Sequence, residues 1–409
     1  MICINPSWPN LLYPNPPQKY ELLQDYYSKF LVSHRVMKLP EDFPLERYFA
    51  EHEFTAPHLL CCSDCETITV QELLQKSGDK ALQEFLQIPL MYSESLGDPD
   101  LRKDIAALYE TIDPSQVLVD AGAAICIYSI ITAALQPGDH LIVQFPCYTS
   151  LTDLAKSYNI EISLWNADPD NNWNMDLNDL EQLIKDNTKM VIVNSPNNPT
   201  GYLMEKEQFN SLIEICKKHK LLFLSDEVYR GLENDDIRLP AACDLYENAI
   251  SLGVMSKSYG LAGLRLGWFA TRCKWLYNKV VSFKDYTTIC VARPSEYLSR
   301  IALTHGKEII QRNTDIVQEN IKIFDEFVNN HTDLLRWNIP RAGPVGFMEI
   351  LNVSSANEFC EKLIAGCGVL LAPGSMFHVH DRNFVRVGLG RKSLPQVVKI
   401  LNQYLNEHK

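Results

Sequence analysis

The chain has 409 residues, of which 46% are hydrophobic, and its 38 basic and 51 acidic residues give a formal net charge of −13. Because single hydrophobic cores stop growing at roughly 250 to 300 residues, we expect two domains. The acidic balance disfavours nucleic acid and anionic membranes as partners and favours a small-molecule ligand.

The N-terminus and the cysteines indicate the compartment. Residues 1–10 have no cationic start and no apolar core, and no apolar stretch approaches the roughly 20 residues of a membrane span. The twelve cysteines are scattered, and several lie in apolar runs, as free thiols do in a reducing compartment. We therefore expect a cytoplasmic protein.

Three of the cysteines cluster, namely Cys61, Cys62 and Cys65. The Cys62-x-x-Cys65 spacing could begin a zinc site or a redox pair. No second C-x-x-C or H-x-x-x-H pattern completes a metal site, so we expect no metal.

Proline content and apolar spacing describe the N-terminal part of the chain. Six prolines among the first forty residues predict an extended arm, with a short helix near residues 20–36. Helical spacing of apolar side chains predicts a helix over residues 44–54 and another that begins at 70–74. Asp98 follows a glycine and can cap a helix over residues 100–110.

From residue 117 short apolar runs alternate with amphipathic stretches, the pattern of parallel strands joined by crossover helices. Nearly continuous apolar strands indicate a sheet that helices cover on both faces. Such sheets bind ligands beyond the carboxyl ends of their strands. The expected strands are residues 117–119, 140–145, 161–165, 190–194, 221–225, 249–254 and 266–270, and the expected helices are 123–135, 149–158, 177–186 and 206–219.

The C-terminal part predicts a smaller domain of mixed helices and strands. Apolar runs at 345–351, 368–371 and 384–389 predict strands, and residues 394–407 predict a helix. The expected divisions are an arm and part of the small domain at 1–59, a large domain at 60–300 and the rest of the small domain at 301–409.

Lys257 follows the buried apolar run 249–254 and precedes a turn of small residues. The long stem of a lysine can cross an apolar pocket and deliver its amine to a carbonyl, which forms a Schiff base. The ordinary alternative is a lysine in a solvated loop, because lysine is rarely buried without a partner.

Other strand ends are followed by residues that suit the same site. Gly122, Ala123 and Ala124 begin a helix whose backbone N–H groups and dipole can bind a phosphate. An aromatic ring, an amide, a carboxylate, a phenol, a hydroxyl and a guanidinium complete the set. These six are Tyr148, Asn198, Asp226, Tyr229, Ser256 and Arg265.

Together these groups suit pyridoxal 5′-phosphate. In such a site a lysine holds the aldehyde and a carboxylate keeps the ring nitrogen protonated, so that the ring accepts electrons from a substrate carbanion. Each residue alone has an ordinary structural role. Agreement among several strand ends on one cofactor favours the site.

Three motifs carry a resemblance to a known family. They are S-P-N-N-P-T-G at 195–201, D-E-V-Y at 226–229 and S-K-S-Y-G-L-A-G-L-R-L-G at 256–267. They resemble the class I and II aminotransferases, which are fold type I pyridoxal-phosphate enzymes, and the similarity runs from about residue 92 to residue 391. It implies an α/β fold with a mostly parallel seven-stranded sheet in a large domain, plus a smaller α+β domain.

The resemblance also implies catalytic roles. Lys257 would form the Schiff base with the cofactor, and Asp226 would contact the pyridine nitrogen. Asn198 and Tyr229 would form hydrogen bonds with the ring hydroxyl, and Tyr148 would stack on the ring.

Further roles concern the phosphate and the substrate. Ser256, Arg265 and the helix start at Gly122, Ala123 and Ala124 would hold the phosphate. Tyr92 would reach the phosphate of the neighbouring subunit, which implies a homodimer. Arg386 would grip the substrate α-carboxylate through two parallel hydrogen bonds, which lysine could not copy.

Two features depart from the usual pattern. Val254 stands where the family often has a phosphate-binding serine. Residues 44–74 resemble the start of capreomycidine synthase-like members, which use this fold for elimination and ring closure on a hydroxylated arginine.

We expect an enzyme that transaminates an L-amino acid to a 2-oxo acid. The alternative reaction is β-elimination and cyclisation of a hydroxylated basic amino acid. A ligand sensor fused to DNA-binding helices is a second class of function, which the acidic charge and the lack of a basic N-terminal domain disfavour.

Overall fold

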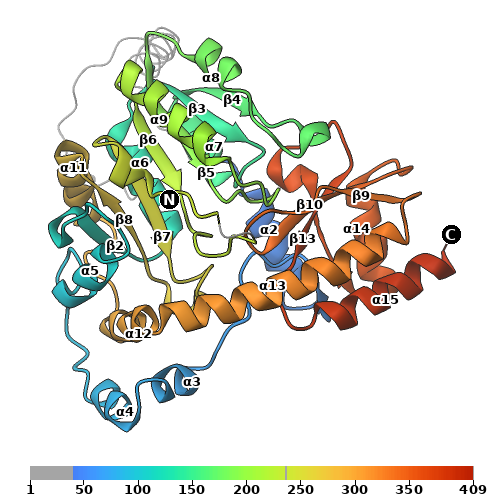
Figure 1. Ribbon diagram of the computed structural model, residues 1–409, viewed down its shortest axis with the longest axis horizontal. Coiled ribbons are helices and arrows are strands. Elements are labelled where there is room, and N and C mark those ends of the chain that lie inside the picture. Colours follow the sequence, from blue (N-terminus) through green and yellow to red (C-terminus); the bar gives the residue numbers. More distant parts are fainter. Residues whose placement is uncertain (1–39, 235–236, 409) are drawn as a thin grey trace, which may run out of the picture. The chain divides into compact units, whose positions relative to one another are not determined.

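A mostly parallel sheet organises the part of the chain that the computed structural model describes, which is residues 40–234 and 237–408 (Figure 1). Its seven strands are β2 (Val117–Asp120), β3 (His140–Phe145), β4 (Glu161–Asn166), β5 (Thr188–Asn194), β6 (Leu222–Asp226), β7 (Ala249–Val254) and β8 (Gly267–Thr271). Their order is β2-β8-β7-β6-β5-β3-β4, and β8 runs antiparallel to both neighbours. The predicted strands are confirmed, with ends that differ by at most two residues.

The sheet is buried on both faces because its strands are apolar at successive positions. On one face Leu141 and Val143 join a core with Ile130 of the helix after β2, whereas Ile142 joins a second core with Phe209 on the other face. This alternation within β3 is the consequence of side chains that point to opposite faces of a strand. Packing on both faces therefore holds the strands in place, and with them the side chains at the strand ends.

Helices occupy the connections between these strands. The 24-residue α13, drawn in orange in Figure 1, was not predicted from the sequence. The helices up to residue 329 are α2 (Pro44–His52), α3 (Val70–Gln75), α4 (Asp79–Leu86), α5 (Pro99–Ala106), α6 (Ala123–Ala134), α7 (Ser150–Ser157), α8 (Leu177–Leu183), α9 (Lys206–His219), α10 (Ala242–Leu245), α11 (Lys274–Lys284), α12 (Arg293–Thr304) and α13 (Gly306–Asn329).

A smaller antiparallel sheet lies in the C-terminal part, with the order β12-β13-β10-β9. Its strands and helices are β9 (Leu335–Trp337), β10 (Val345–Ile350), β12 (Ala372–Pro373), β13 (Phe384–Gly388), α14 (Ala356–Cys367) and α15 (Leu394–Glu407). Short β1 (His58–Leu59) pairs in parallel with β11 (Val369–Leu370), so the segment after α2 is held by the C-terminal part. The predicted domain boundaries at 59/60 and 300/301 stay a prediction.

Some expected elements have different bounds. The helix expected at 100–110 ends at Ala106, and beyond it the N–H groups of Glu110 and Thr111 donate to the Asp244 carboxylate at 3.0 and 2.8 Å. The helix expected at 177–186 ends at Leu183, and the strand expected at 368–371 is split into β11 and β12.

Two further observations concern the N-terminal residues and membrane-spanning helices. The helix expected near residues 20–36 lies outside the described residues. Among residues 40–234 and 237–408, the structure contains no helix with the length and apolar character needed to span a membrane.

Candidate active site

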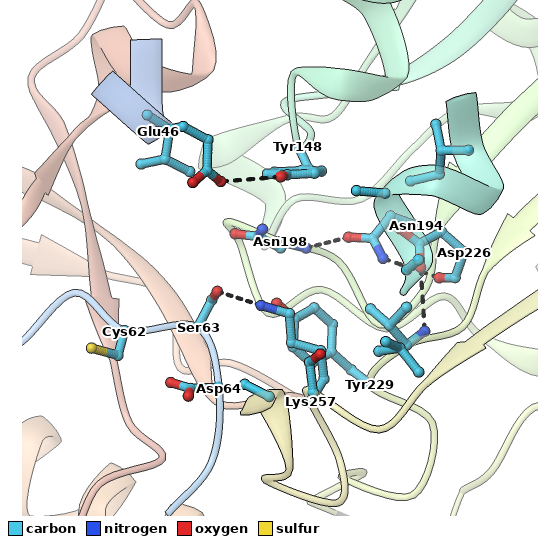
Figure 2. Close-up of a pocket in the computed structure, with 18 of the residues that line it drawn as sticks. Glu46, Cys62, Ser63, Asp64, Tyr148, Asn194, Asn198, Asp226, Tyr229 and Lys257 are labelled. Atoms are coloured by element: carbon cyan, nitrogen blue, oxygen red, sulfur yellow. Dashed lines mark hydrogen bonds between the residues drawn. The ribbon is translucent and has the colours of Figure 1, made fainter. Parts of the chain in front are cut away.

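A cavity of about 390 Å³ opens at the carboxyl ends of the large sheet (Figure 2). Two sets of residues face each other across it. The first set, here called the sheet wall, follows the strand ends and consists of Ala123, Ala124, Ile127, Tyr148, Asn194, Asn198, Asp226, Val228, Tyr229, Val254, Ser256, Lys257, Ala262 and Arg265. The second set, here called the α2 wall, consists of Leu45, Glu46, Phe49, Glu53, Cys62, Ser63 and Asp64.

Lys257 reaches across the cavity from the turn after β7. Its Nζ donates a hydrogen bond to Ser63 Oγ at 2.8 Å and lies 5.9 Å from the centre of the Tyr229 ring (Figure 2). The turn closes where the Gly260 N–H donates to the Lys257 carbonyl at 3.0 Å. Gly260 has a φ of +67°, and a Cβ there would lie 2.6 Å from the Glu66 carbonyl oxygen, so the turn requires glycine. The amine thus joins the two walls.

Asp226 ends β6 and is only 4% exposed. Its Oδ1 accepts a hydrogen bond from the Val228 N–H at 3.3 Å, and no cation among the described residues forms an ion pair with it. Burial raises the pKa of this carboxyl to about 7, and the Lys257 charge opposes the shift. A buried carboxyl in this state fits a ligand that brings a protonated ring nitrogen.

Two asparagines link the sheet wall to Arg386. Asn194 Oδ1 accepts from the Asn198 N–H at 2.7 Å, and Asn194 Nδ2 donates to the Asp226 carbonyl at 3.0 Å (Figure 2). Asn198 Oδ1 in turn accepts from Arg386 Nη1 at 3.1 Å. The asparagine turn is therefore held in place by the strand ends of β5 and β6.

Arg386 itself is fully buried behind Asn198 and does not line the cavity. Its Nε and Nη2 donate to the Cys61 carbonyl at 3.1 and 2.8 Å, and its guanidinium lies 5.6 Å from the Phe49 ring centre. Of its five N–H groups, two have no hydrogen bond to a described residue.

The start of α6 forms an anion cradle. No side chain caps this helix, so its first N–H groups have no side-chain partner. A Cβ at Gly267 would lie 2.8 Å from the Ala123 nitrogen, and a Cβ at Gly122 would lie 2.9 Å from Arg265 Nη2. The glycines thus allow β8 and a guanidinium to approach the helix start. Free N–H groups, a helix dipole and a guanidinium fit a phosphate.

Ser256 and Arg265 meet beside this cradle. Arg265 Nη1 donates to Ser256 Oγ at 3.4 Å and to the Ala262 carbonyl at 3.3 Å. Val254, at the usual phosphate-serine position, is buried and contributes only apolar surface.

Tyr148 and Tyr229 place aromatic rings at the cavity. The Tyr148 hydroxyl donates to Glu46 Oε1 at 3.2 Å and joins the sheet wall to the α2 wall (Figure 2). Burial and the Glu46 charge raise the pKa of Tyr148, so its phenol stays protonated at neutral pH. Tyr229 is almost completely buried.

Tyr92 is a third predicted site residue that does not line the cavity, besides Arg386 and Gly122. It is 81% exposed, in the segment before α5. Glu296 fixes this segment, because it accepts hydrogen bonds from the Ser93 hydroxyl and, at 2.8 Å, from the Asp98 N–H. The Tyr92 side chain is therefore accessible to a group that does not belong to the described residues of the same chain.

Sequence reasoning missed the whole α2 wall, although one signal was available. Glu46, Phe49 and Glu53 are spaced three and four residues apart, which places them on one face of the predicted helix. No pattern in the sequence says which cavity that face would cover. Cys61, Cys62 and Cys65 are buried free thiols, and the described residues contain no group of three or more potential metal ligands.

Comparisons with known proteins agree with this geometry. The model of the family described as Aminotransferase class I and II matches residues 60–400. The chain is 28% identical over 368 residues to capreomycidine synthase of Streptomyces vinaceus, covering 89% of this chain and 94% of that protein. It is 27% identical over 314 residues to a probable aspartate aminotransferase of Methanocaldococcus jannaschii, covering 74% and 81% of the two chains.

A solved structure gives the same result at the level of the fold. The crystal structure of a PLP-dependent aminotransferase from Streptococcus suis 89-1591 superposes with a TM-score of 0.85 at 30% identity. The match covers 90% of this chain and 98% of that one.

Proposed function

The chain belongs to the class I and II aminotransferases, a family of pyridoxal-phosphate enzymes, and we propose that it transaminates an L-amino acid to a 2-oxo acid. The observation that carries the proposal is that Lys257, Asp226, Asn198 and the start of α6 line one cavity of about 390 Å³. A volume of this size suits a cofactor with a small substrate.

The proposed cofactor contacts follow from the chemistry of the lining groups. Asp226 would face the ring nitrogen, Asn198 and Tyr229 the ring hydroxyl, and Tyr148 the ring face. The phosphate would occupy the cradle formed by Ala123, Ala124, Ser256 and Arg265, next to Gly122. When bound, the cofactor supplies an electron sink for the substrate α-carbon.

Lys257 is proposed both to hold the cofactor and to move the α-proton. Lys257 lines the cavity and its amine donates to Ser63 Oγ of the α2 wall at 2.8 Å, so the amine lies between the two walls. A positioned amine of this kind can remove a proton from the substrate α-carbon and deliver it to another atom of the substrate or the cofactor. Arg386, two of whose N–H groups have no hydrogen bond to a described residue, would hold the α-carboxylate.

A second reaction is supported by one observation. The chain matches capreomycidine synthase over 94% of that protein's length, although at 28% identity. Elimination of a β-substituent followed by cyclisation needs the same lysine and the same carboxylate contacts, and it differs only in the fate of the carbanion. Fold membership does not decide between the two reactions.

Product counting without an oxo-acid acceptor tests the proposal. The purified enzyme, loaded with cofactor, is mixed with an excess of each amino acid in a panel, and products are identified by mass. Transamination predicts one equivalent of 2-oxo acid per site, because the amino group stays on the cofactor. Many equivalents of an alkene-derived or cyclised product without acceptor would instead establish the elimination reaction.

We also propose that the active unit is a cytoplasmic homodimer. Exposed Tyr92 would complete the phosphate cradle of the neighbouring subunit, and the free cysteines suit a reducing compartment. Inactive Tyr92→Phe and Lys257→Ala chains are mixed and allowed to exchange. Recovered activity supports shared sites, and no recovery despite confirmed exchange contradicts them.

A further inference from the structure

Two carboxylates of the α2 wall line the cavity. Glu46 and Glu53 both line it, and within the described parts of the chain neither takes part in an ion pair. Glu46 accepts a hydrogen bond from the neutral Tyr148 hydroxyl at 3.2 Å, which brings no positive charge. Burial, together with the negative charges of Asp64 and Glu46, raises the pKa of Glu53. The charges of Arg391 and Lys257 oppose this shift, but neither forms an ion pair with Glu53 among the described residues.

The remaining charges of the cavity have partners. Asp64 accepts two hydrogen bonds from Arg391 Nη2, at 2.9 and 2.8 Å. Under the proposed function, Asp226 faces the ring nitrogen, Arg265 faces the phosphate and Lys257 carries the cofactor. Glu46 and Glu53 are therefore the carboxylates of this cavity that have neither an ion-pair partner among the described residues nor, under the proposed function, a partner on the cofactor.

Their positions place them where a substrate side chain would lie. Glu46, Phe49 and Glu53 share one face of α2 and its end, and seven residues of helix span about 10 Å. The Phe49 ring between them lies 5.6 Å from the Arg386 guanidinium, the group proposed to hold the α-carboxylate. A substrate anchored at Arg386 would therefore extend its side chain along the carboxylate-bearing face of α2.

We propose that the substrate carries a cationic side chain, an ammonium or a guanidinium, which Glu46 and Glu53 bind. The inference rests on the proposed function, because the positions of the cofactor and the α-carboxylate come from it. It names a substrate class and is independent of whether the carbanion is transaminated or loses a β-substituent. A dicarboxylic amino acid is disfavoured, because its second carboxylate would meet the negative charges of Glu46 and Glu53.

Matched substrates test the proposal in the intact holoenzyme. L-arginine is compared with L-citrulline, its neutral analogue of similar shape, and L-lysine with L-norleucine; L-aspartate is the acidic control. Dissociation constants come from cofactor absorbance without acceptor, and kcat/KM comes from product formation. We expect the cationic member of each pair to bind and react at least about tenfold better than its neutral partner.

Variants then assign the preference to the two carboxylates. Glu46→Gln and Glu53→Gln should each lower kcat/KM for L-arginine at least about threefold, and the double variant at least about tenfold, while L-citrulline changes less than about twofold. Glu51→Gln is the matched control, because it removes the same charge from the same helix at an exposed position that does not line the cavity. It should leave both substrates unchanged.

The outcomes separate this inference from the function on which it rests. Equal losses for L-arginine and L-citrulline, or a wild-type preference for L-citrulline, L-norleucine or L-aspartate, would overturn the cationic side chain and leave an amino-acid enzyme in place. If no amino acid of the panel changes the cofactor absorbance or gives a product, the proposed function falls as well.

Discussion

The two walls of the cavity differ in how they are built. The sheet wall consists of residues at the strand ends of the large sheet and in the turns and helix beside them, where strand pairing fixes positions such as those of the β5–β6 pair Asn194 and Asp226. The α2 wall consists of one helix and the segment Cys62 to Asp64, held through β1 and through the Ser63, Asp64 and Glu46 side chains. The difference suggests that the sheet wall carries out the chemistry of the reaction and that the α2 wall selects the substrate.

Among the substitutions in the two walls, removal of the lysine should have the largest effect on turnover. Lys257→Ala is expected to lower turnover at least about 10³-fold, because a positioned acid or base contributes roughly 10² to 10⁴. Turnover is measured with saturating cofactor, and circular dichroism checks that the fold is retained. A variant that keeps a tenth of the wild-type turnover would place the chemistry outside the sheet wall.

The next largest effect concerns the carboxylate of the sheet wall. Asp226→Asn keeps the shape and the acceptor for the Val228 N–H but removes the charge, so turnover should fall about 10²- to 10³-fold at saturating cofactor. The dissociation constant of the cofactor should change far less. Equal changes in both quantities would mean that Asp226 serves mainly to bind the cofactor.

The same substitution should alter the pH dependence of stability in the cofactor-free protein. The folded pKa of about 7 lies above the ordinary value of 3.8, so this carboxyl favours folding most below about pH 4, and the contribution is lost as the pH rises toward 7. Asp226→Asn should therefore gain stability over wild type across this range, by up to roughly 4 kcal/mol.

Urea unfolding at several pH values measures this gain, and added cofactor is the control. A protonated ring nitrogen would pair with the carboxylate, so cofactor should shrink the difference between the two proteins. A difference that stays constant from pH 4 to pH 8 would contradict the raised pKa of Asp226.

The smallest effect is expected for the contact between the walls. Tyr148→Phe removes the hydrogen bond to Glu46 but keeps the ring, and a hydrogen bond of this kind contributes about 0.5 to 1.5 kcal/mol. KM for the best amino acid should rise about 3- to 10-fold with little change in kcat. A large fall in kcat would show that the phenol acts in the chemistry of the sheet wall.

The walls also differ in how far the sequence predicts them. Asp226, Asn198, Lys257 and the start of α6 were predicted because a strand end locates a residue in space as well as in sequence, and because motifs mark these ends. The folding pattern of the sheet follows from apolar runs for the same reason. No strand-end rule of this kind applies to the residues before 117.

What the sequence could not predict depends on contacts between distant segments. The α2 wall is placed by β1 pairing with β11, more than 300 residues away, and Arg386 is held by the Cys61 carbonyl, 325 residues away. Local patterns describe the helix over 44–54 but contain no information on its neighbour. Tyr92 was identified by motif alone, and its exposure leaves its role to an experiment on the assembled protein.

Under the proposed function, Lys257 carries the cofactor at the strand ends of the large sheet. Borohydride reduction of the purified holoenzyme, followed by protease digestion and mass spectrometry, tests it most directly. We expect the reduced cofactor to be attached to the peptide that contains Lys257 and to no other lysine. Attachment at another lysine, or a holoenzyme with no reducible attachment, would contradict it.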